Sequence, residues 1–258
     1  MTAPAAAALP VPRLVIWRHG RTEWNAAGRF QGQLDPPLDD VGRRQAAQAA
    51  SYLACELPSE GTVVVSSDLS RATETAIALT DVLGVPLRID PRLREHGLGC
   101  WEGLTRDEVA RLYPDQYADW VAGRPVRDRG GEEAAHVGER ALAALVDLPR
   151  GAVAVVVTHG GTAGRLLEAL LGLGPDHRRV FGSLGNCAWS DLNRQSGRWR
   201  VMRHNSALPA PAEGTRSGQD PARAGASAGT TGPSSAGHGA VDPADGAPGD
   251  TSDAEAVL

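Results

Sequence analysis

The stretch RLVIWRHGRTEWN, residues 13–25, decides the fold. Its first part, 13–17, is short and apolar and predicts a buried strand. Arg18, His19 and Gly20 follow, so a cation, an imidazole and a glycine come directly after the strand. In open α/β sheets, ligands bind beyond the carboxyl ends of the strands. The stretch therefore predicts both a strand and one wall of a site.

The rest of the chain alternates between apolar runs and amphipathic segments. We expect further strands at 62–65, 85–89, 152–157, 186–192 and 198–202. Helices are expected from Asp39–Asp40 to about Ala54, from Ser70 to Gly84, and over 105–112, 132–148 and 162–171, with Pro114 ending the short one. This alternation predicts an α/β fold, a mostly parallel sheet covered on both faces, with the last two strands adding an antiparallel edge.

The end of the chain differs in composition. Of the last 52 residues, 37 are Ala, Gly, Pro, Ser or Thr, and seven acidic residues against two basic ones account for the whole net charge of −5. Such a segment cannot bury enough apolar area to offset its ordering entropy. We expect a flexible N-terminus over 1–12, one catalytic domain over 13–206 and a disordered acidic tail over 207–258. The sequence leaves open whether the tail is passive or regulatory.

Composition excludes several classes of function. The chain has 26 basic residues, all of them Arg, so enzymes that depend on a P-loop lysine or a lysine Schiff base are excluded. The basic residues form no long block, which argues against nucleic acid binding. No apolar run is long enough for a membrane span. Because no basic residue precedes the apolar start, we expect no secretory signal and a cytoplasmic protein.

Three strand ends are expected to meet at one edge of the sheet. The first carries Arg18 and His19, the second carries 66–68 just before Arg71, and the third carries His159 and Gly160. Two guanidinium groups and two imidazoles make a cationic cup for a tetrahedral dianion. The helix after Gly160 would add backbone N–H donors, and the glycines at 20 and 160 leave room for close backbone approach.

At this point the sequence resembles a known family. The segment 18–25, RHGRTEWN, is similar to the RHGxTxxN signature of the histidine phosphatase superfamily, phosphoglycerate mutase-like branch. The resemblance continues in order over 13–203, through QG at 31–32, PL at 37–38, SDLSRA at 67–72, LRE at 93–95, WEG at 101–103 and THGG at 158–161. It implies a three-layer αβα sandwich of the phosphoglycerate mutase type.

The resemblance also implies roles for the cup. His19 would attack phosphorus as a neutral imidazole and form a phosphohistidine, since neighbouring guanidinium charge favours the neutral form. Arg18, Arg71 and His159 would hold the phosphoryl oxygens. Asn25 would add a hydrogen bond to the phosphate.

Glu95 would be the general acid, which protonates the leaving oxygen and then activates water. A bound phosphate dianion favours the protonated acid that this role needs. The alternative for Glu95 is a surface salt bridge with a neighbouring arginine. Arg21, Gln31 and Gly32, together with His96, are expected to contact the rest of the substrate.

We also predict where four of the tryptophans lie. Trp17 and Trp189 are expected in the core, and Trp24 and Trp101 at the mouth of the pocket.

Several functions stay open. The segment between Glu95 and His159 is shorter than in the mutases of the family, which favours a phosphatase over a mutase. We expect no cofactor, no metal and a small phosphorylated metabolite as partner. The segments 32–46, 66–76 and 93–105, with 185–192 and 197–201, resemble most the glucosyl-3-phosphoglycerate phosphatase type of actinobacteria. The alternative substrates are α-ribazole phosphate, sugar phosphates and phosphoglycerate. A metal hydrolase using His19, His159 and Glu95, and an inactive phosphate-binding scaffold, are other classes. A homodimer through edge strands is a further option.

Overall fold

The computed structural model describes residues 8–58, 60–174, 177 and 180–209. The first seven residues and most of the expected tail, 210–258, lie outside the described residues. The described strands form a six-stranded sheet with the order β3-β2-β4-β1-β5-β6. The strands are β1 (Arg13–Arg18), β2 (Thr62–Ser66), β3 (Leu87–Ile89), β4 (Val153–Thr158), β5 (Trp189–Gln195) and β6 (Arg198–Ser206).

The sheet is parallel except at one side. β1 and β2 both pair with β4 in parallel register, and β3 pairs with β2 in the same way. β5 pairs with β1 in antiparallel register, and β6 with β5. The expected mostly parallel sheet with an antiparallel edge is therefore confirmed.

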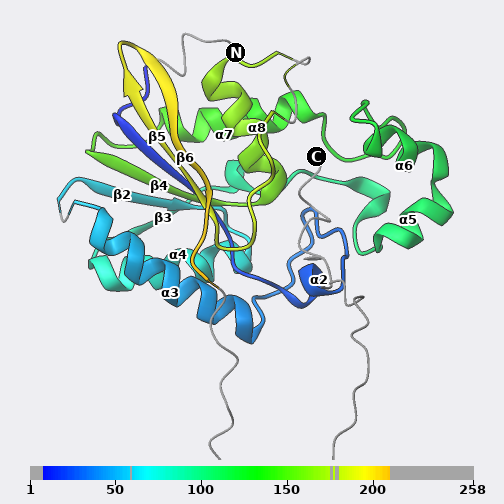
Figure 1. Cartoon of the computed structure of the whole chain (residues 1–258), viewed down its shortest axis with the longest axis horizontal. Helices are drawn as coiled ribbons and strands as arrows, with labels where there is room; N and C mark the ends of the chain where they lie inside the picture. Colours follow the sequence, from blue (N-terminus) through cyan, green and yellow to red (C-terminus); the bar gives the residue numbers. More distant parts are fainter. Residues whose placement is uncertain (1–7, 59, 175–176, 178–179, 210–258) are drawn as a thin grey trace, which may run out of the picture. The chain divides into compact units, whose positions relative to one another are not determined.

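Helices cover both faces of this sheet (Figure 1). α3 (Asp40–Glu56) and α4 (Ser70–Leu83) lie on one face, and α7 (Ala134–Val146) and α8 (Gly160–Leu171) on the other. Alternation along β1 supplies both layers: Leu14 and Ile16 pack in the cluster with α7 and α8, while Val15 and Trp17 pack in the cluster with α3 and α4. The three-layer αβα arrangement is confirmed.

Local sequence signals define where the main helices begin and end. Asp39 caps α3 by accepting a hydrogen bond from the amide of Gly42. Gly84 ends α4 in the left-handed conformation, with φ of 66°. α8 begins at Gly160, two residues earlier than expected, and His159 is its N-cap residue.

A small helical unit projects beside the sheet. It contains α5 (Arg106–Leu112) and α6 (Pro114–Val121). Pro114 does not simply end a helix, as we expected; it starts α6, because a proline at the first helical position sacrifices no hydrogen bond. Trp101 is fully buried among Phe30, Leu98, Val109 and Trp120, so its expected place at the pocket mouth is wrong.

The N-terminal boundary also needs correction. Leu9 and Val11, which we placed in a flexible N-terminus, are buried in the core. The backbone carbonyls of Leu9 and Pro12 accept hydrogen bonds from Arg194, which ties 8–12 to β5. Leu208, which we placed in the tail, packs against the α3–α4 layer. Within the described part of the chain, no helix is both long and apolar enough to cross a bilayer.

Candidate active site

The three strand ends meet at one edge of the sheet, as expected. β1 leads into His19, whose amide donates to the carbonyl of Thr158 at the end of β4. The ring centroids of His19 and His159 lie 5.1 Å apart. Arg71, in the first turn of α4, and Arg18 are fully buried with them. The fold thus gathers two imidazoles and two guanidinium groups from distant parts of the sequence.

The tautomer of His19 follows from one hydrogen bond. Its Nδ1 atom lies 2.7 Å from the carbonyl oxygen of Gly20, which can only accept. Nδ1 therefore carries the proton and Nε2 carries the lone pair. Nε2 is buried and has no hydrogen-bond partner among the described residues. A lone pair held in this way is available as a nucleophile.

Burial and charge keep this imidazole neutral. Burial, and then the positive charges of Arg71 and Arg18, lower the pKa of His19 well below its usual range. Burial, followed by Arg71, His19 and Arg18, lowers the pKa of His159 in the same way. Because a protonated His19 would have no lone pair at Nε2, the same charges that would attract a phosphate also maintain the nucleophile.

Backbone carbonyls orient the two arginines. Arg18 Nη1 donates to the carbonyl of Leu184 at 2.6 Å. Arg71 donates through Nη1 to Leu34 and through Nη2 to Gly32, at 2.7 and 2.8 Å. Arg71 Nη1 also lies 3.8 Å from Asp35 Oδ1. The carbonyl contacts hold both guanidinium groups at the cup, where their positive charge favours a bound anion.

Glu95 is fully buried and is bound to the N-terminus of α8. Its Oε1 accepts from the amides of His96 and Thr162, at 2.8 and 2.9 Å, and from the Thr162 hydroxyl at 3.3 Å. Oε2 accepts a single hydrogen bond, from the amide of Gly161 at 3.1 Å. The alternative of a surface salt bridge is therefore wrong. Oε2, which has the fewer donors, is the oxygen that could carry a proton.

This arrangement corrects one expectation about α8. We expected the amides at its N-terminus to bind phosphate directly. Those of Gly161 and Thr162 instead hold Glu95, because a carboxylate at a helix N-terminus satisfies free N–H groups and the helix dipole.

Arg140 braces the loop that carries Glu95. Its Nη1 donates to the carbonyls of Arg92 and Arg94, and its Nη2 to the carbonyl of Glu95, all at 2.7 to 2.9 Å. It also pairs with the carboxylate of Glu132 through two hydrogen bonds. One guanidinium thus fixes three carbonyls around the acid.

Asn25 has one side of its amide group occupied. Its Oδ1 accepts from the amide and hydroxyl of Thr22 and from Asn186 Nδ2, each at 3.1 Å. The Nδ2 group is the part of Asn25 that remains for an oxyanion. Gln31 is fully buried behind it and accepts from the Thr22 hydroxyl at 3.0 Å.

Two expected substrate residues are engaged within the protein. Arg21 forms an ion pair with Asp39, with Nε and Oδ2 2.8 Å apart. His96 is buried, and its Nε2 lies 2.8 Å from the carbonyl oxygen of Glu132.

The glycine positions of the site differ in whether a larger residue would fit. A Cβ at Gly20 would lie 2.5 Å from the carbonyl oxygen of Gly42, so this position requires glycine. A Cβ at Gly160 would meet only the Arg18 guanidinium, at 3.5 Å, which is an ordinary contact. Gly32 serves through its backbone, by accepting from Arg71.

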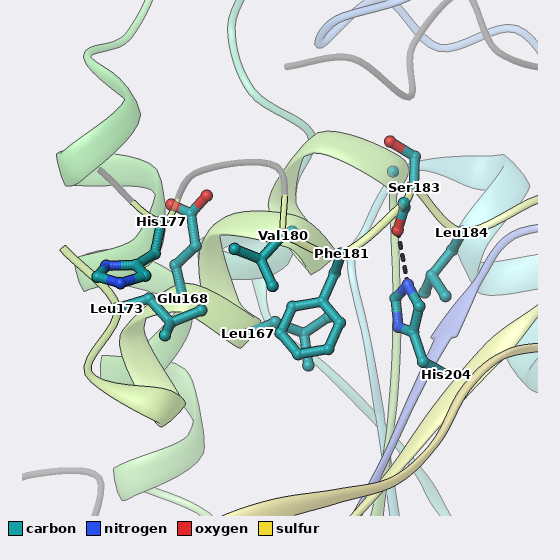
Figure 2. Close-up of a pocket in the computed structure, with 12 residues that line it drawn as sticks. Leu167, Glu168, Leu173, His177, Val180, Phe181, Ser183, Leu184 and His204 are labelled. Carbon is teal, nitrogen blue, oxygen red and sulfur yellow. Dashed lines mark hydrogen bonds between the residues drawn. The ribbon is translucent and has the colours of Figure 1, made fainter. Parts of the chain in front are cut away.

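A small hollow lies beside the cup (Figure 2). Leu167, Val180 and Phe181 line its middle, with His177 and Glu168 on one side and His204 on the other. His204 Nε2 donates to the carbonyl of Gly182 at 2.6 Å. Among the described residues, those that line the hollow include no arginine. It lies against the segment that presents the Leu184 carbonyl to Arg18.

Sequence reasoning missed several supporting residues. Ser67 Oγ lies 3.0 Å from His159 Nε2, and Thr75 Oγ1 accepts from the amide of Gly20 at 3.0 Å. The sequence analysis placed Ser67 at the second strand end, 66–68, but gave it no role. Thr75, Asn186 and Arg140 carry no local signal, because each acts through a contact with a distant segment.

No group of three or more His, Cys, Asp or Glu side chains in the described residues could hold a metal ion. The fully buried His19, His159 and Glu95 therefore do not form such a group.

Comparisons with known proteins agree with this geometry. The sequence model described as "Histidine phosphatase superfamily (branch 1)" matches residues 14–207. A glucosyl-3-phosphoglycerate phosphatase of Mycolicibacterium vanbaalenii is 44% identical over 192 residues, which cover 70% of this chain and 84% of the relative. A Yersinia pestis protein described as "Probable phosphoglycerate mutase GpmB" is 37% identical over 194 residues, 72% of this chain and 87% of the relative.

A solved structure is similar over the same region. A mycobacterial glucosyl-3-phosphoglycerate phosphatase in complex with VO3 matches with a TM-score of 0.68 and 38% identity, covering 76% of this chain and all of that one.

Proposed function

Because the chain belongs to the histidine phosphatase superfamily, and is a phosphatase of that family, we propose that it hydrolyses a small phosphorylated metabolite through a phosphohistidine at His19. One observation carries this proposal: the Nε2 lone pair of His19 is buried, unpartnered among the described residues and close to two guanidinium groups. The proposed chemistry needs neither a metal nor a cofactor.

In the first step, the Nε2 lone pair attacks phosphorus and the bond from phosphorus to the ester oxygen breaks. Arg18 and Arg71, with Asn25 and His159, stabilise the charge on the three phosphoryl oxygens. Glu95 gives its proton to the leaving oxygen, so the product is a neutral alcohol. The negative charge of the incoming phosphate favours the protonated form of Glu95 before this step.

In the second step, a water molecule attacks the phosphohistidine. Glu95, now a carboxylate, takes a proton from the water as the bond between Nε2 and phosphorus breaks. Inorganic phosphate leaves, and His19 returns to its neutral tautomer because Gly20 still accepts from Nδ1.

For the substrate, we propose glucosyl-3-phosphoglycerate. The support is the name of the relatives with 39 to 44% identity, from mycobacteria. A phosphate-release screen would test this proposal with glucosyl-3-phosphoglycerate, phosphoglycerates, sugar phosphates and α-ribazole phosphate. Preferred turnover of any of the others would replace this substrate without affecting the mechanism.

A mutase is the second candidate, supported by the GpmB relative. The two activities differ in the acceptor: a phosphatase releases inorganic phosphate, whereas a mutase returns the phosphoryl group to phosphoglycerate. Incubation with 3-phosphoglycerate, with both 2-phosphoglycerate and free phosphate measured, separates them. We expect free phosphate to dominate.

The test of the proposed function uses p-nitrophenyl phosphate. We expect phosphate release that a metal chelator does not reduce and that His19→Ala abolishes. Loss of activity with the chelator would indicate a metal hydrolase. Absence of any His19-dependent release would indicate a scaffold without catalysis.

A further inference from the structure

The Ser67 hydroxyl contacts the second histidine of the cup. Ser67 lies directly after β2, and both Ser67 and His159 are fully buried. The Oγ atom of Ser67 lies 3.0 Å from Nε2 of His159, although the two residues are 92 positions apart in the sequence. A buried hydroxyl needs an acceptor for its proton, because an unsatisfied buried polar group is unfavourable. This contact therefore bears on which ring nitrogen of His159 carries a proton.

Three hydrogen bonds fix the backbone of Ser67. Its amide donates to the carbonyl of Val157 on β4 at 3.0 Å. Its carbonyl accepts from the hydroxyls of Ser66 and Thr73, at 2.8 and 3.0 Å. Because these bonds connect Ser67 to β4 and to α4, the fold itself sets the position of the Ser67 side chain next to His159.

The hydroxyl of Ser67 makes two contacts that use it differently. It accepts from the amide of Leu69 at 3.3 Å, and this contact uses a lone pair of Oγ because an amide can only donate. The other contact is to Nε2 of His159. Among the described residues, Nε2 is the only acceptor that contacts this hydroxyl. The hydroxyl proton therefore belongs to the bond with Nε2.

This assignment determines the tautomer of His159. Burial, followed by the positive charge of Arg71, lowers the pKa of His159 well below its usual range, so the ring is neutral near neutral pH. A neutral imidazole carries one proton and one lone pair on its two nitrogens. Because Nε2 accepts from Ser67, the proton is on Nδ1. Nδ1 is buried and has no hydrogen-bond partner among the described residues.

The opposite tautomer would satisfy fewer groups. With the proton on Nε2, the Ser67 hydroxyl would accept from His159, and its own proton would have no acceptor among the described residues. Nδ1 would then hold a lone pair, which repels a phosphoryl oxygen because that oxygen also presents lone pairs. With the proton on Nδ1, the hydroxyl is satisfied and His159 supplies an N–H donor to the same buried cluster as Arg18 and Arg71.

We propose that Ser67 is a positioning residue that sets the tautomer of His159, so that the Nδ1–H group of His159 donates to a phosphoryl oxygen of the bound ester. This inference rests on the proposed function and deepens it, because it assigns the proton of the second histidine. The two histidines then have the same tautomer and different tasks. The Gly20 carbonyl keeps a lone pair on Nε2 of His19 for phosphorus, whereas the Ser67 hydroxyl keeps a proton on Nδ1 of His159 for oxygen.

Nitrogen NMR of the full-length enzyme with ¹⁵N-labelled histidine measures this tautomer directly. A ring nitrogen that carries a proton and one that carries a lone pair differ widely in chemical shift, and couplings to the ring protons distinguish Nδ1 from Nε2. The signals that disappear in His159→Gln belong to His159. We expect its proton on Nδ1 in the wild type near neutral pH, both without a ligand and with inorganic phosphate. A wild-type His159 with its proton on Nε2 would overturn the proposal.

Ser67→Ala removes the donor to Nε2. The proton of His159 should then move to Nε2 in a large part of the molecules, and the dissociation constant for inorganic phosphate should rise about two- to tenfold, as the loss of one hydrogen bond would give. Ser67→Ala also removes the acceptor of the Leu69 amide, so the affinity alone does not decide the question, whereas the tautomer does. Ser67→Cys keeps a weak S–H donor at the same place and should retain part of the Nδ1–H population.

Ser66→Ala is the matched control. Ser66 is also fully buried and precedes Ser67, but its hydroxyl donates to the Ser67 carbonyl and not to an imidazole. It should leave the tautomer of His159 and the affinity for phosphate as in the wild type. An unchanged tautomer in Ser67→Ala, or an equal change in Ser66→Ala, would overturn the proposal. These measurements need no turnover, so they are separate from the proposed function, which fails only if His19-dependent release from p-nitrophenyl phosphate is absent.

Discussion

His19 Nδ1 lies 2.7 Å from the carbonyl oxygen of Gly20, and this one contact leaves the lone pair of the imidazole on Nε2. The carbonyl is itself held in place. The Gly20 amide donates to Thr75 on α4, and a side chain at Gly20 would collide with the backbone of Gly42 on α3. Both helices on one face of the sheet therefore help to orient the nucleophile.

Thr75 should contribute to both stability and turnover, although it lies 55 residues from Gly20 in the sequence. Thr75→Val leaves the buried amide of Gly20 without its partner, which should cost about 1–3 kcal/mol in the free energy of unfolding and lower kcat. Thr80→Val is the control, because among the described residues the Thr80 hydroxyl donates to the carbonyl of Ile77, within α4 itself. Denaturant unfolding and turnover of p-nitrophenyl phosphate check both. Equal effects of the two substitutions would refute this role of Thr75.

The buried histidines make stability depend on pH. The pKa values of His19 and His159 are lowered by folding, so below pH 6.5 the unfolded chain binds protons that the folded chain does not. Stability is therefore fully present above pH 6.5 and decreases as the pH falls towards the folded pKa values, by up to about 1.4 kcal/mol per pH unit for each histidine. Urea unfolding at several pH values between 5 and 7.5 measures the slope.

The control for this slope is His19→Asn, which removes one of the three buried histidines whose pKa folding lowers, the others being His96 and His159. It should make the dependence shallower by up to about one proton. Carboxylates such as Asp68, whose pKa is lowered by Arg94, titrate below this range and do not contribute to it. A stability that is constant from pH 7.5 to 5 would contradict the neutral, buried imidazoles.

The loss of rate on removal of Glu95 should be larger for a more basic leaving group. Glu95→Gln removes the proton donor, so hydrolysis of an alkyl phosphate such as a sugar phosphate should slow by about 10²–10⁴-fold. p-Nitrophenolate leaves without a proton, so formation of the phosphoenzyme from p-nitrophenyl phosphate should slow much less. Single-turnover rates with both substrates decide this point. Equal losses would show that Glu95 does not act as the acid.

Arg140 should support both stability and the position of Glu95. Arg140→Met removes the cation that pairs with Glu132 and the side-chain donor to the carbonyls of Arg92 and Arg94. Glu132 and the Glu95 carbonyl still accept from Gln33, so the substitution should cost about 1–3 kcal/mol in the free energy of unfolding. Arg43→Met removes an exposed pair with Asp40 and should have little effect. Thermal or denaturant unfolding compares the two. A stable Arg140→Met variant with an intact preference between leaving groups would contradict the bracing role.

Much of the sheet could be predicted because the hydrophobic periodicity and the residue composition of each short segment identify the strands. The run at Val153–Thr158 is apolar on both faces and could only be a central strand, and Asp39 and Gly84 are strong helix-end signals. The rim residues followed from the topology, since the carboxyl ends of parallel strands share one edge. Pro114 was misinterpreted because a proline can equally end one helix or begin the next.

The rest of the site depends on contacts that no local pattern records. Glu95 reaches the N-terminus of α8 because its loop packs there, although the loop lies more than sixty residues earlier in the chain. The burial of Trp101 depends on α6, which the sequence analysis did not predict.

The most direct measurement is a rapid-quench experiment that traps the enzyme during turnover of p-nitrophenyl phosphate, followed by mass spectrometry of its peptides at alkaline pH. The account predicts one phosphoryl group on the peptide that contains His19, stable in base, lost in acid and absent from His19→Ala. A phosphoryl group that survives acid, or that lies on any other residue, would contradict it.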